Sequence, residues 1–294
     1  MFFVGTDREA AVEQSLKVQA EIERFLETGE SDMMCFAWEG ANHLERIKRG
    51  NEEMLTALVT EVRRRAGRAR MSAALRDVNT KELALRKAEP MVRGFFPKTE
   101  REQVLRLLDD CIVFLTPDNI ESVMRDCDWL STAWNLANIF LNSLGSEALS
   151  ESKNGIMGLS EEQTCYVSPA YFTEDHPFAD YVVHEMAHVF HNCKRQDAGL
   201  KEIRNKEWLI DIDYSSRENF AYACEAYSRI LERSRGPSER NSLAGQFKGF
   251  GIKDHRVDNE RVTEIVRAAS RRRNGWKEIL EHCRKGRNHY VQTS

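Results

Sequence analysis

One stretch decides how this chain folds, and its sequence is Asp180-Tyr181-Val182-Val183-His184-Glu185-Met186-Ala187-His188-Val189-Phe190-His191. His184 and His188 are four residues apart, so a helix places both imidazoles on one face, one turn apart. Two imidazole nitrogens at that spacing can bind the same zinc ion. Glu185 follows His184 by about 100° around the helix, within reach of a water molecule on such an ion. The pattern therefore predicts a metal site on a helix.

The apolar residues of this segment predict that the helix is buried. Measured from His184, four residues lie within about 40° of the opposite side of the helix: Val182, Met186, Val189 and Cys193. We therefore expect a core helix over residues 177–193 with an apolar back and a histidine front. The alternative is a core helix whose histidines bind no metal. Unpaired polar groups in a core cost about 1–3 kcal/mol each, which favours the metal site.

His191 is an obvious candidate for a third ligand, but helix geometry argues against it. It lies seven residues beyond His184, which is about 10 Å of axial rise. Three side chains spread along one straight helix cannot converge on one ion. We expect His191 to form a hydrogen bond beside the site or to line the cleft. Because a catalytic zinc site usually has three protein ligands, the third must come from elsewhere in the chain.

A second amphipathic segment, residues 217–231, supplies acidic candidates for that ligand. Its apolar face has helical spacing and consists of Phe220, Ala223, Cys224, Tyr227 and Leu231. The other face carries four polar side chains within about 40° of one another: Glu218, Tyr222, Glu225 and Arg229. Such a row can be ordinary solvated surface. Beside a helix with two histidines it predicts the missing half of a metal site.

The run Glu218-Asn219-Phe220-Ala221-Tyr222-Ala223, thirty residues after His188, resembles a helix of lethal-factor-like gluzincins. Gluzincins are zinc peptidases whose third ligand is a Glu on a second helix. The resemblance covers roughly residues 160–232 and is specific for the metal site. It implies a Zn²⁺ ion held by His184, His188 and Glu218.

The resemblance also suggests roles for three further residues. Glu225 lies on the same helix face as Glu218 and is the alternative ligand. If Glu218 is the ligand, we expect Glu225 to orient a ligand histidine through its free N–H, and Tyr222 either to do the same or to pack. Lethal-factor-like enzymes keep a Tyr that stabilises the transition state slightly upstream of the Glu ligand. Tyr214 is the candidate here, with a packed loop tyrosine as the alternative.

A strand is expected just before the metal-site helix. Residues 163–168 have strand composition and are followed by Pro169. In zincin folds the strand before the metal helix lies at the edge of the sheet, over the cleft. The resemblance thus implies an edge strand that can hold an extended peptide by main-chain hydrogen bonds.

Together these residues predict the hydrolysis of peptide bonds. Zinc lowers the pKa of a water molecule that it binds towards 7. Glu185 is expected to accept the proton as general base, and the zinc to stabilise the oxyanion. We therefore expect a zinc-dependent endopeptidase that acts on an intracellular protein or peptide substrate. The alternatives are a DNA-linked regulatory protease and a catalytically inactive zinc-binding interaction protein, although the second has no use for Glu185.

The remainder of the chain indicates the fold class. It has 294 residues but only six prolines, and apolar periods of three and four dominate. These features predict a mainly α (α+β) fold with a small sheet. A break at residues 89–97 predicts two parts. Residues 1–95 form a helical N-terminal region, and residues 96–294 form a zincin-like metallopeptidase domain with C-terminal helices.

Charge and cysteine usage limit the partners and the compartment. Two arginine clusters occur, but the net charge is −4 and no nucleic-acid-binding motif is recognised, so nucleic-acid binding is not expected. No apolar run is as long as a membrane span. Seven cysteines without disulfide spacing and an N-terminus unlike a signal peptide predict a cytoplasmic protein, with a delivered effector as a variant. The oligomeric state is not predicted.

Overall fold

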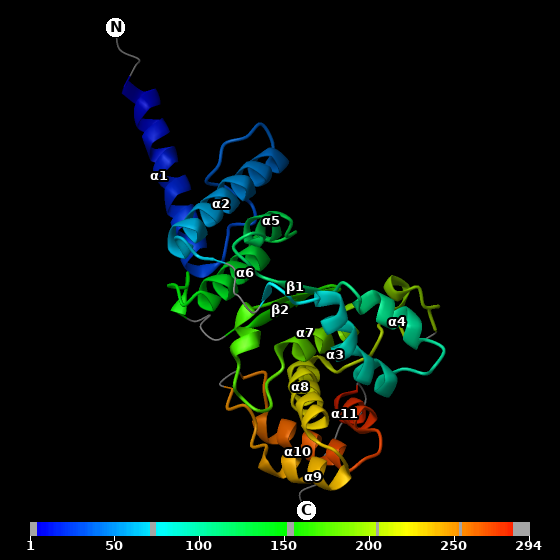
Figure 1. Cartoon of the computed structure of the whole chain (residues 1–294). Coiled ribbons are helices and arrows are strands. Elements are labelled where there is room, and N and C mark those ends of the chain that lie inside the picture. The colour runs from blue at the N-terminus through cyan, green and yellow to red at the C-terminus, as the bar shows by residue number, and fades with distance from the viewer. Residues whose placement is uncertain (1–4, 71–74, 152–155, 204–205, 253–254, 285–294) are drawn as a thin grey trace, which may run out of the picture. The chain divides into compact units, whose positions relative to one another are not determined.

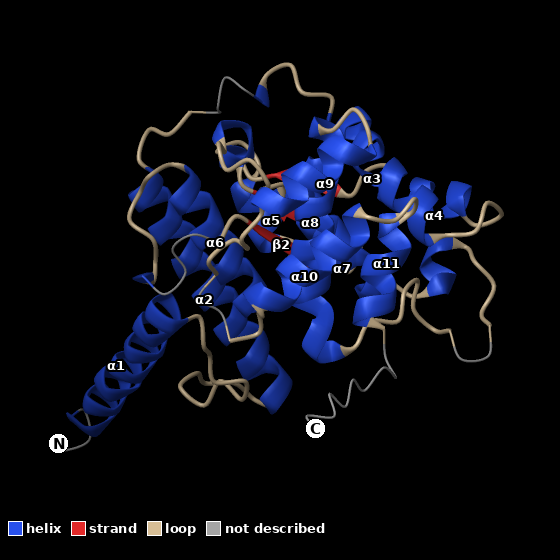
Figure 2. Cartoon of the chain, turned by 90° about the horizontal axis from the view of Figure 1, so that it is seen from below, coloured by secondary structure: helices blue, strands red, loops and turns tan. Residues whose placement is uncertain are grey.

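The computed structural model describes residues 5–70, 75–151, 156–203, 206–252 and 255–284. Within these ranges helices predominate and a single small three-stranded sheet is present (Figures 1 and 2), which confirms the expected mainly α (α+β) class. The chain divides into two compact units, and each unit is built from two segments of sequence. The first comprises Met1–Arg76 and Leu115–Met157, and the second comprises Asp77–Phe114 and Gly158–Ser294.

The first unit is helical. Its helices are α1 (Gly5–Thr28), α2 (His43–Ala66), α5 (Ile120–Arg125) and α6 (Leu130–Ser143). α2 packs against the other three and buries an apolar stripe: Met54, Leu58, Val59 and Val62. The chain must therefore return to this unit after leaving it, because α5 and α6 complete the packing around α2. This division differs from the expected boundary between residues 95 and 96.

The second unit contains the sheet. Its strands are β1 (Ile112–Phe114), β2 (Gly158–Glu161) and β3 (Thr164–Val167), in the order β1-β3-β2. β1 is parallel to β3, and β2 is antiparallel to it. The expectation of an edge strand at residues 163–168 is therefore wrong: β3 is central and β2 lies at an edge. The parallel partner of β3 comes from about fifty residues earlier in the chain, and local composition does not reveal such a pairing.

The helices of the second unit pack against this sheet and against one another. They are α3 (Thr80–Phe95), α4 (Arg101–Leu108), α7 (Tyr181–Asn192), α8 (Arg217–Arg233), α9 (Pro237–Gln246), α10 (Asn259–Ser270) and α11 (Gly275–Cys283). α7 packs against β2 and β3 and also against α8, and α10 and α11 pack against α8 (Figure 1). The ring of Phe95 at the end of α3 lies 5.5–5.7 Å, between centroids, from those of Phe190, Phe220 and Trp276. This aromatic cluster fixes α7 and α8 in one core.

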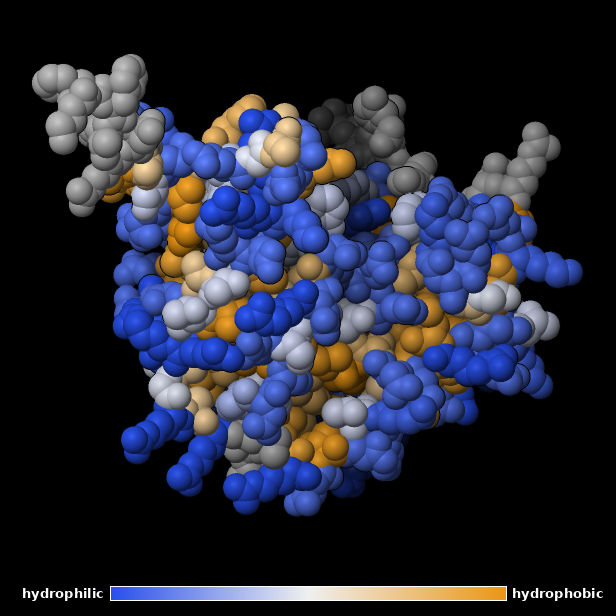
Figure 3. All heavy atoms as spheres, turned by 90° about the horizontal axis from the view of Figure 1, so that it is seen from above, coloured by the Kyte–Doolittle hydropathy of each residue, from blue (hydrophilic) through white to orange (hydrophobic). Residues whose placement is uncertain are grey.

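The surface carries mixed polar and apolar side chains. Figure 3 shows hydrophilic side chains over most of the face in view, with hydrophobic patches between them. Among the described residues, no helix is both long enough and apolar enough to cross a membrane.

Candidate metal centre

A buried ion pair anchors the start of the histidine helix. The side chain of Asp180 accepts a hydrogen bond from the backbone N–H of Val183 at 3.3 Å, which caps α7. The helix therefore begins at Tyr181, four residues later than the sequence suggested. The other carboxylate oxygen of Asp180 accepts a hydrogen bond from Nζ of Lys87 on α3 at 2.6 Å, and both side chains are buried. This pair attaches the N-terminus of α7 to α3.

Three predicted ligand residues meet where α7 faces the first turn of α8. The Nε2 atoms of His184 and His188 are 3.2 Å apart. Oε2 of Glu218 lies 3.8 Å from Nε2 of His184 and 3.7 Å from Nε2 of His188. The structure thus brings together the two histidines, which are one turn apart on α7, and an acid from thirty residues further along the chain.

The separations of these donor atoms fit a zinc ion. Two ligand atoms at the usual Zn–N and Zn–O distances and a tetrahedral angle are about 3.4 Å apart. The three observed separations, 3.2, 3.7 and 3.8 Å, lie close to that value. Two imidazole nitrogens and a carboxylate oxygen are also a donor set that zinc prefers. His184, His188 and Glu218 can therefore hold the ion with little rearrangement.

Glu225 lies behind the cluster and orients His184. Its Oε2 atom is 3.0 Å from Nδ1 of His184, on the side of the ring away from the other two candidate ligands. Its Oε1 atom accepts a hydrogen bond from the backbone N–H of Asp180 at 2.8 Å. Both carboxylate oxygens of Glu225 are thus occupied, and it is Glu218 that faces the two Nε2 atoms. This is the arrangement expected if Glu218 is the ligand and Glu225 orients a histidine.

The other two candidate ligands, His188 and Glu218, also have partners that orient them. Nδ1 of His188 is 3.0 Å from Nε2 of His191, whose Nδ1 is 3.1 Å from the side-chain oxygen of Asn192. Oε1 of Glu218 pairs with the guanidinium of Arg256 at 3.1 Å. Hydrogen bonds of this kind set the direction and tautomer of a metal-binding side chain. His191 therefore lies beside the site, as expected from its distance along the helix.

The two tyrosines occupy different surroundings. The ring of Tyr222 packs edge-on against the ring of His184, with centroids 4.4 Å apart, and also contacts Phe250. Tyr214 precedes α8, has 81% of its surface exposed, and lies under the guanidinium of Arg217. Tyr222 thus helps to hold the imidazole of His184. The catalytic role of Tyr214 stays a prediction.

Glu185 is a buried carboxylate held against an edge of the sheet. Only 7% of its surface is exposed. It lies against Gly158 of β2, where a Cβ atom would come within 2.6 Å of its Oε1 atom. Burial raises the pKa of Glu185 to about 7, although the charge of His184 and a hydrogen bond with Ser160 act in the other direction. A carboxyl group with this pKa can both accept and release a proton near neutral pH.

The surrounding groups shift the pKa values of His184 and His188 in opposite directions. Burial opposes the protonation of His184, but the hydrogen bond and charge of Glu225 raise its pKa to about 9. Burial and the neighbouring His184 lower the pKa of His188 well below its usual value. Of the two, His184 thus binds a proton more readily, and a metal ion at its Nε2 atom would compete with that proton.

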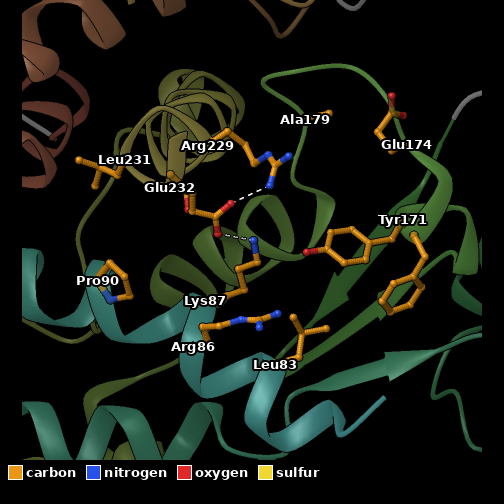
Figure 4. Close-up of a pocket in the computed structure, with 12 residues that line it drawn as sticks. Leu83, Arg86, Lys87, Pro90, Tyr171, Glu174, Ala179, Arg229, Leu231 and Glu232 are labelled. Carbon is orange, nitrogen blue, oxygen red and sulfur yellow. Dashed lines mark hydrogen bonds and ion pairs between the residues drawn. The ribbon is translucent and has the colours of Figure 1, made fainter. Parts of the chain in front are cut away.

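A separate cavity lies at the other end of α8. It has a volume of about 720 Å³ and is lined by residues of α3, of the segment 171–179 and of the last turns of α8. Its charged centre is Lys87, whose Nζ atom contacts Glu232 at 2.5 Å, and Glu232 in turn pairs with Arg229 (Figure 4). Lys87 thus belongs both to the wall of this cavity and to the cap of α7.

Sequence reasoning missed Gly158, Lys87 and Arg256. Each contacts the site from a segment far away in the sequence, and none belongs to a recognisable local pattern. Asp180 is different, because an Asp directly before an amphipathic run is a typical helix cap and could have been predicted. Its link to Lys87 could not.

Comparison with known proteins yields no relatives: no family model matches the chain, and neither does any curated protein or solved structure.

Proposed function

We propose that this protein is a zinc-dependent peptidase that hydrolyses peptide bonds of a protein or peptide substrate. The observation that carries the proposal is the meeting of His184, His188 and Glu218 at ligand distances, with the buried carboxylate of Glu185 next to His184 on the same helix. A purely structural zinc site needs the three ligands but gains nothing from a further buried acid that does not bind the ion. A hydrolase needs that acid as a base.

In this proposal Glu185 moves the protons. Zinc, when bound, acts as a Lewis acid on water and on the scissile carbonyl. Glu185 accepts a proton from the attacking water and passes it to the leaving amine. Its pKa of about 7 suits both steps, because the group is close to half-protonated near neutral pH. Glu225 and His191 hold the ligand imidazoles in their directions throughout.

Strand β2 is the proposed docking edge for the substrate backbone. It pairs with β3 along one side and lies at the edge of the sheet. Gly158 of this strand contacts Glu185, so a peptide added along β2 passes next to the base. Extended peptides bind such edges through main-chain hydrogen bonds, largely independently of their side chains.

We place this activity in the cytoplasm, either of the producing cell or of a cell that receives the protein as an effector. The support is that the seven cysteines are free thiols, as is usual in a reducing compartment.

Metal analysis and one variant test the proposal. The purified protein is expected to bind one zinc per chain and to cleave members of a quenched fluorescent peptide library. Glu185→Gln is expected to keep the fold and the zinc but to lose about 10²–10⁴-fold in rate, because it removes the base alone. Glu264→Gln, at an exposed position on α10, is the control and should cleave normally. Less than about half an equivalent of zinc, or cleavage by Glu185→Gln at the normal rate, contradicts the proposal.

A further inference from the structure

α8 begins with an arginine at a position where a cation is unfavourable. The helix dipole places partial positive charge at the N-terminus, and a cation there costs about 0.3–1 kcal/mol. Arg217 is the first residue of α8 and directly precedes Glu218. Its Nε atom is buried without a hydrogen-bond partner among the described residues, which is a further cost. The stability of the helix therefore does not explain this arginine.

Arg217 directly precedes Glu218, whose Oε2 atom lies 3.7 Å from Nε2 of His188 in the metal cluster. After burial, its charge is the largest cause that lowers the pKa of His191, and it contributes to the low pKa of His188. The guanidinium carbon of Arg217 lies 5.3 Å from the ring centroid of Tyr214, whose side chain is exposed. Arg217 is therefore next to a candidate ligand in sequence and against a ring that faces solvent.

A second guanidinium flanks the same ligand. Arg256, in the segment before α10, pairs with Oε1 of Glu218 at 3.1 Å. Its side chain is 59% exposed, so that ion pair is open to solvent. Arg217 and Arg256 therefore place positive charge on the rim of the proposed active site.

The carboxylates of the site do not neutralise Arg217. Each carboxylate has a partner other than Arg217. Glu185 forms a hydrogen bond with Ser160, Glu218 pairs with Arg256, and Glu225 contacts His184 and the backbone N–H of Asp180. No ion pair of Arg217 is found in the described part of the chain, whereas Arg229 on the same helix pairs with Glu232 at 2.7 Å. With a divalent ion bound, the two guanidinium groups and the two positive charges of the ion outweigh the three carboxylates, so the site carries a net positive charge.

We propose that Arg217 and Arg256 bind a carboxylate of the substrate next to the scissile bond, so that the enzyme acts on acidic peptides. This inference rests on the peptidase function proposed above. A guanidinium holds a carboxylate through two parallel charge-assisted hydrogen bonds, which suits this task better than it suits a solvated helix end. The carboxylate belongs either to an Asp or Glu side chain or to the free end of the peptide, since both present the same group.

Peptide binding to the zinc-loaded Glu185→Gln protein tests the inference without requiring cleavage. The probes are fluorescein-labelled hexapeptides in which Glu replaces Gln at each position in turn, each with either an amidated or a free C-terminus. Fluorescence anisotropy gives their dissociation constants. At one position, Glu is expected to bind about tenfold more tightly than Gln, and the difference should shrink as salt is added. If instead only the free C-terminus confers tighter binding, the carboxylate is that of the chain end.

Variants then assign the effect to the two arginines. Arg217→Gln in this background should remove most of the preference for the carboxylate. Arg229→Gln, on the same helix but paired with Glu232, is the matched control and should keep it. Zinc content is measured first for Arg256→Gln, because Arg256 contacts a ligand. Equal binding of the acidic and neutral peptides, or a preference that survives in the Arg217→Gln/Arg256→Gln double variant, overturns the inference.

The outcomes separate this inference from the proposed function. If the wild-type protein cleaves peptides at equal rates whether or not they carry a carboxylate, the peptidase proposal stands and the inference fails. If acidic peptides bind with the expected preference but the wild-type protein cleaves none, the anion site stands and the peptidase proposal fails.

Discussion

Replacing Glu225 tests how far zinc affinity depends on the orientation of His184 rather than on the bonds to the ion. If His184 binds zinc through Nε2, its Nδ1–H donates a hydrogen bond to Oε2 of Glu225. Glu225→Gln keeps the shape of the side chain but has only one oxygen. If that oxygen serves the backbone N–H of Asp180, the amide NH₂ faces the N–H of His184. If the amide is flipped, the buried N–H of Asp180 loses its acceptor.

The expected loss follows from these two contacts. Loss of a partner that orients a ligand costs about 10–100-fold in metal affinity, which corresponds to about 1.4–2.7 kcal/mol. Glu225→Ala removes the acceptors of both groups. It should therefore also lower the free energy of unfolding by about 1–3 kcal/mol, because the N–H of Asp180 is left buried and unpaired. Glu218→Ala removes a metal–oxygen bond and a charge, so its loss of zinc affinity should be the largest of the three.

Competition with a chromophoric zinc chelator gives the affinity ranking, and urea denaturation gives the stabilities. The expected order of zinc affinity is wild type, then Glu225→Gln and Glu225→Ala, then Glu218→Ala. Glu264→Gln serves as the control, since its side chain is exposed and lies on α10. Loss of the metal by Glu225→Ala together with its retention by Glu218→Ala would show that Glu225, and not Glu218, is the ligand.

Three further predictions concern other contacts of the site. Gly158→Ala should keep zinc but lose most peptidase activity, because the new Cβ atom would lie 2.6 Å from Oε1 of Glu185 and displace the base. Zinc content and peptide cleavage are measured together, and normal cleavage would refute this prediction. Lys87→Met should lower the free energy of unfolding by about 3–5 kcal/mol, because it leaves the carboxylate of Asp180 buried without its partner. Burial opposes the charge of Lys87, but Asp180 and the other groups around Lys87 raise its pKa above the ordinary value. The ion pair therefore stabilises the fold fully below the ordinary lysine pKa, and this contribution is lost as pH rises through the higher pKa of the folded state. Urea denaturation from neutral to strongly alkaline pH should thus show a fall in the free energy of unfolding that the variant lacks. His191→Leu should weaken zinc binding about 10–100-fold, because it removes the hydrogen-bond acceptor for Nδ1 of His188. An unchanged zinc affinity in chelator competition would show that this hydrogen bond is unimportant.

The helices of the site were predictable because their signals are local. The spacing of His184 and His188 defines a helix face by itself, and the apolar residues opposite them indicate burial. The same periodicity identified the helix of Glu218, and the overall balance of apolar periods indicated a mainly helical chain. A pattern of period 3.6 needs no knowledge of distant segments, so the sequence alone was sufficient for the fold class and for the candidate ligands.

The choice between Glu218 and Glu225 was different, since both lie on one face of one helix. The packing of α8 against α7 placed Glu218 at the Nε2 atoms and Glu225 at the opposite nitrogen of His184. The central position of β3 and the links of Lys87 and Arg256 to the site likewise depend on residues that are far apart in the chain. Helical periodicity determines which side chains share a face, and therefore which residues can bind a metal together. Only the packing of distant segments decides which atoms meet, because the burial and ion pairs that hold those segments together have no fixed spacing in the sequence.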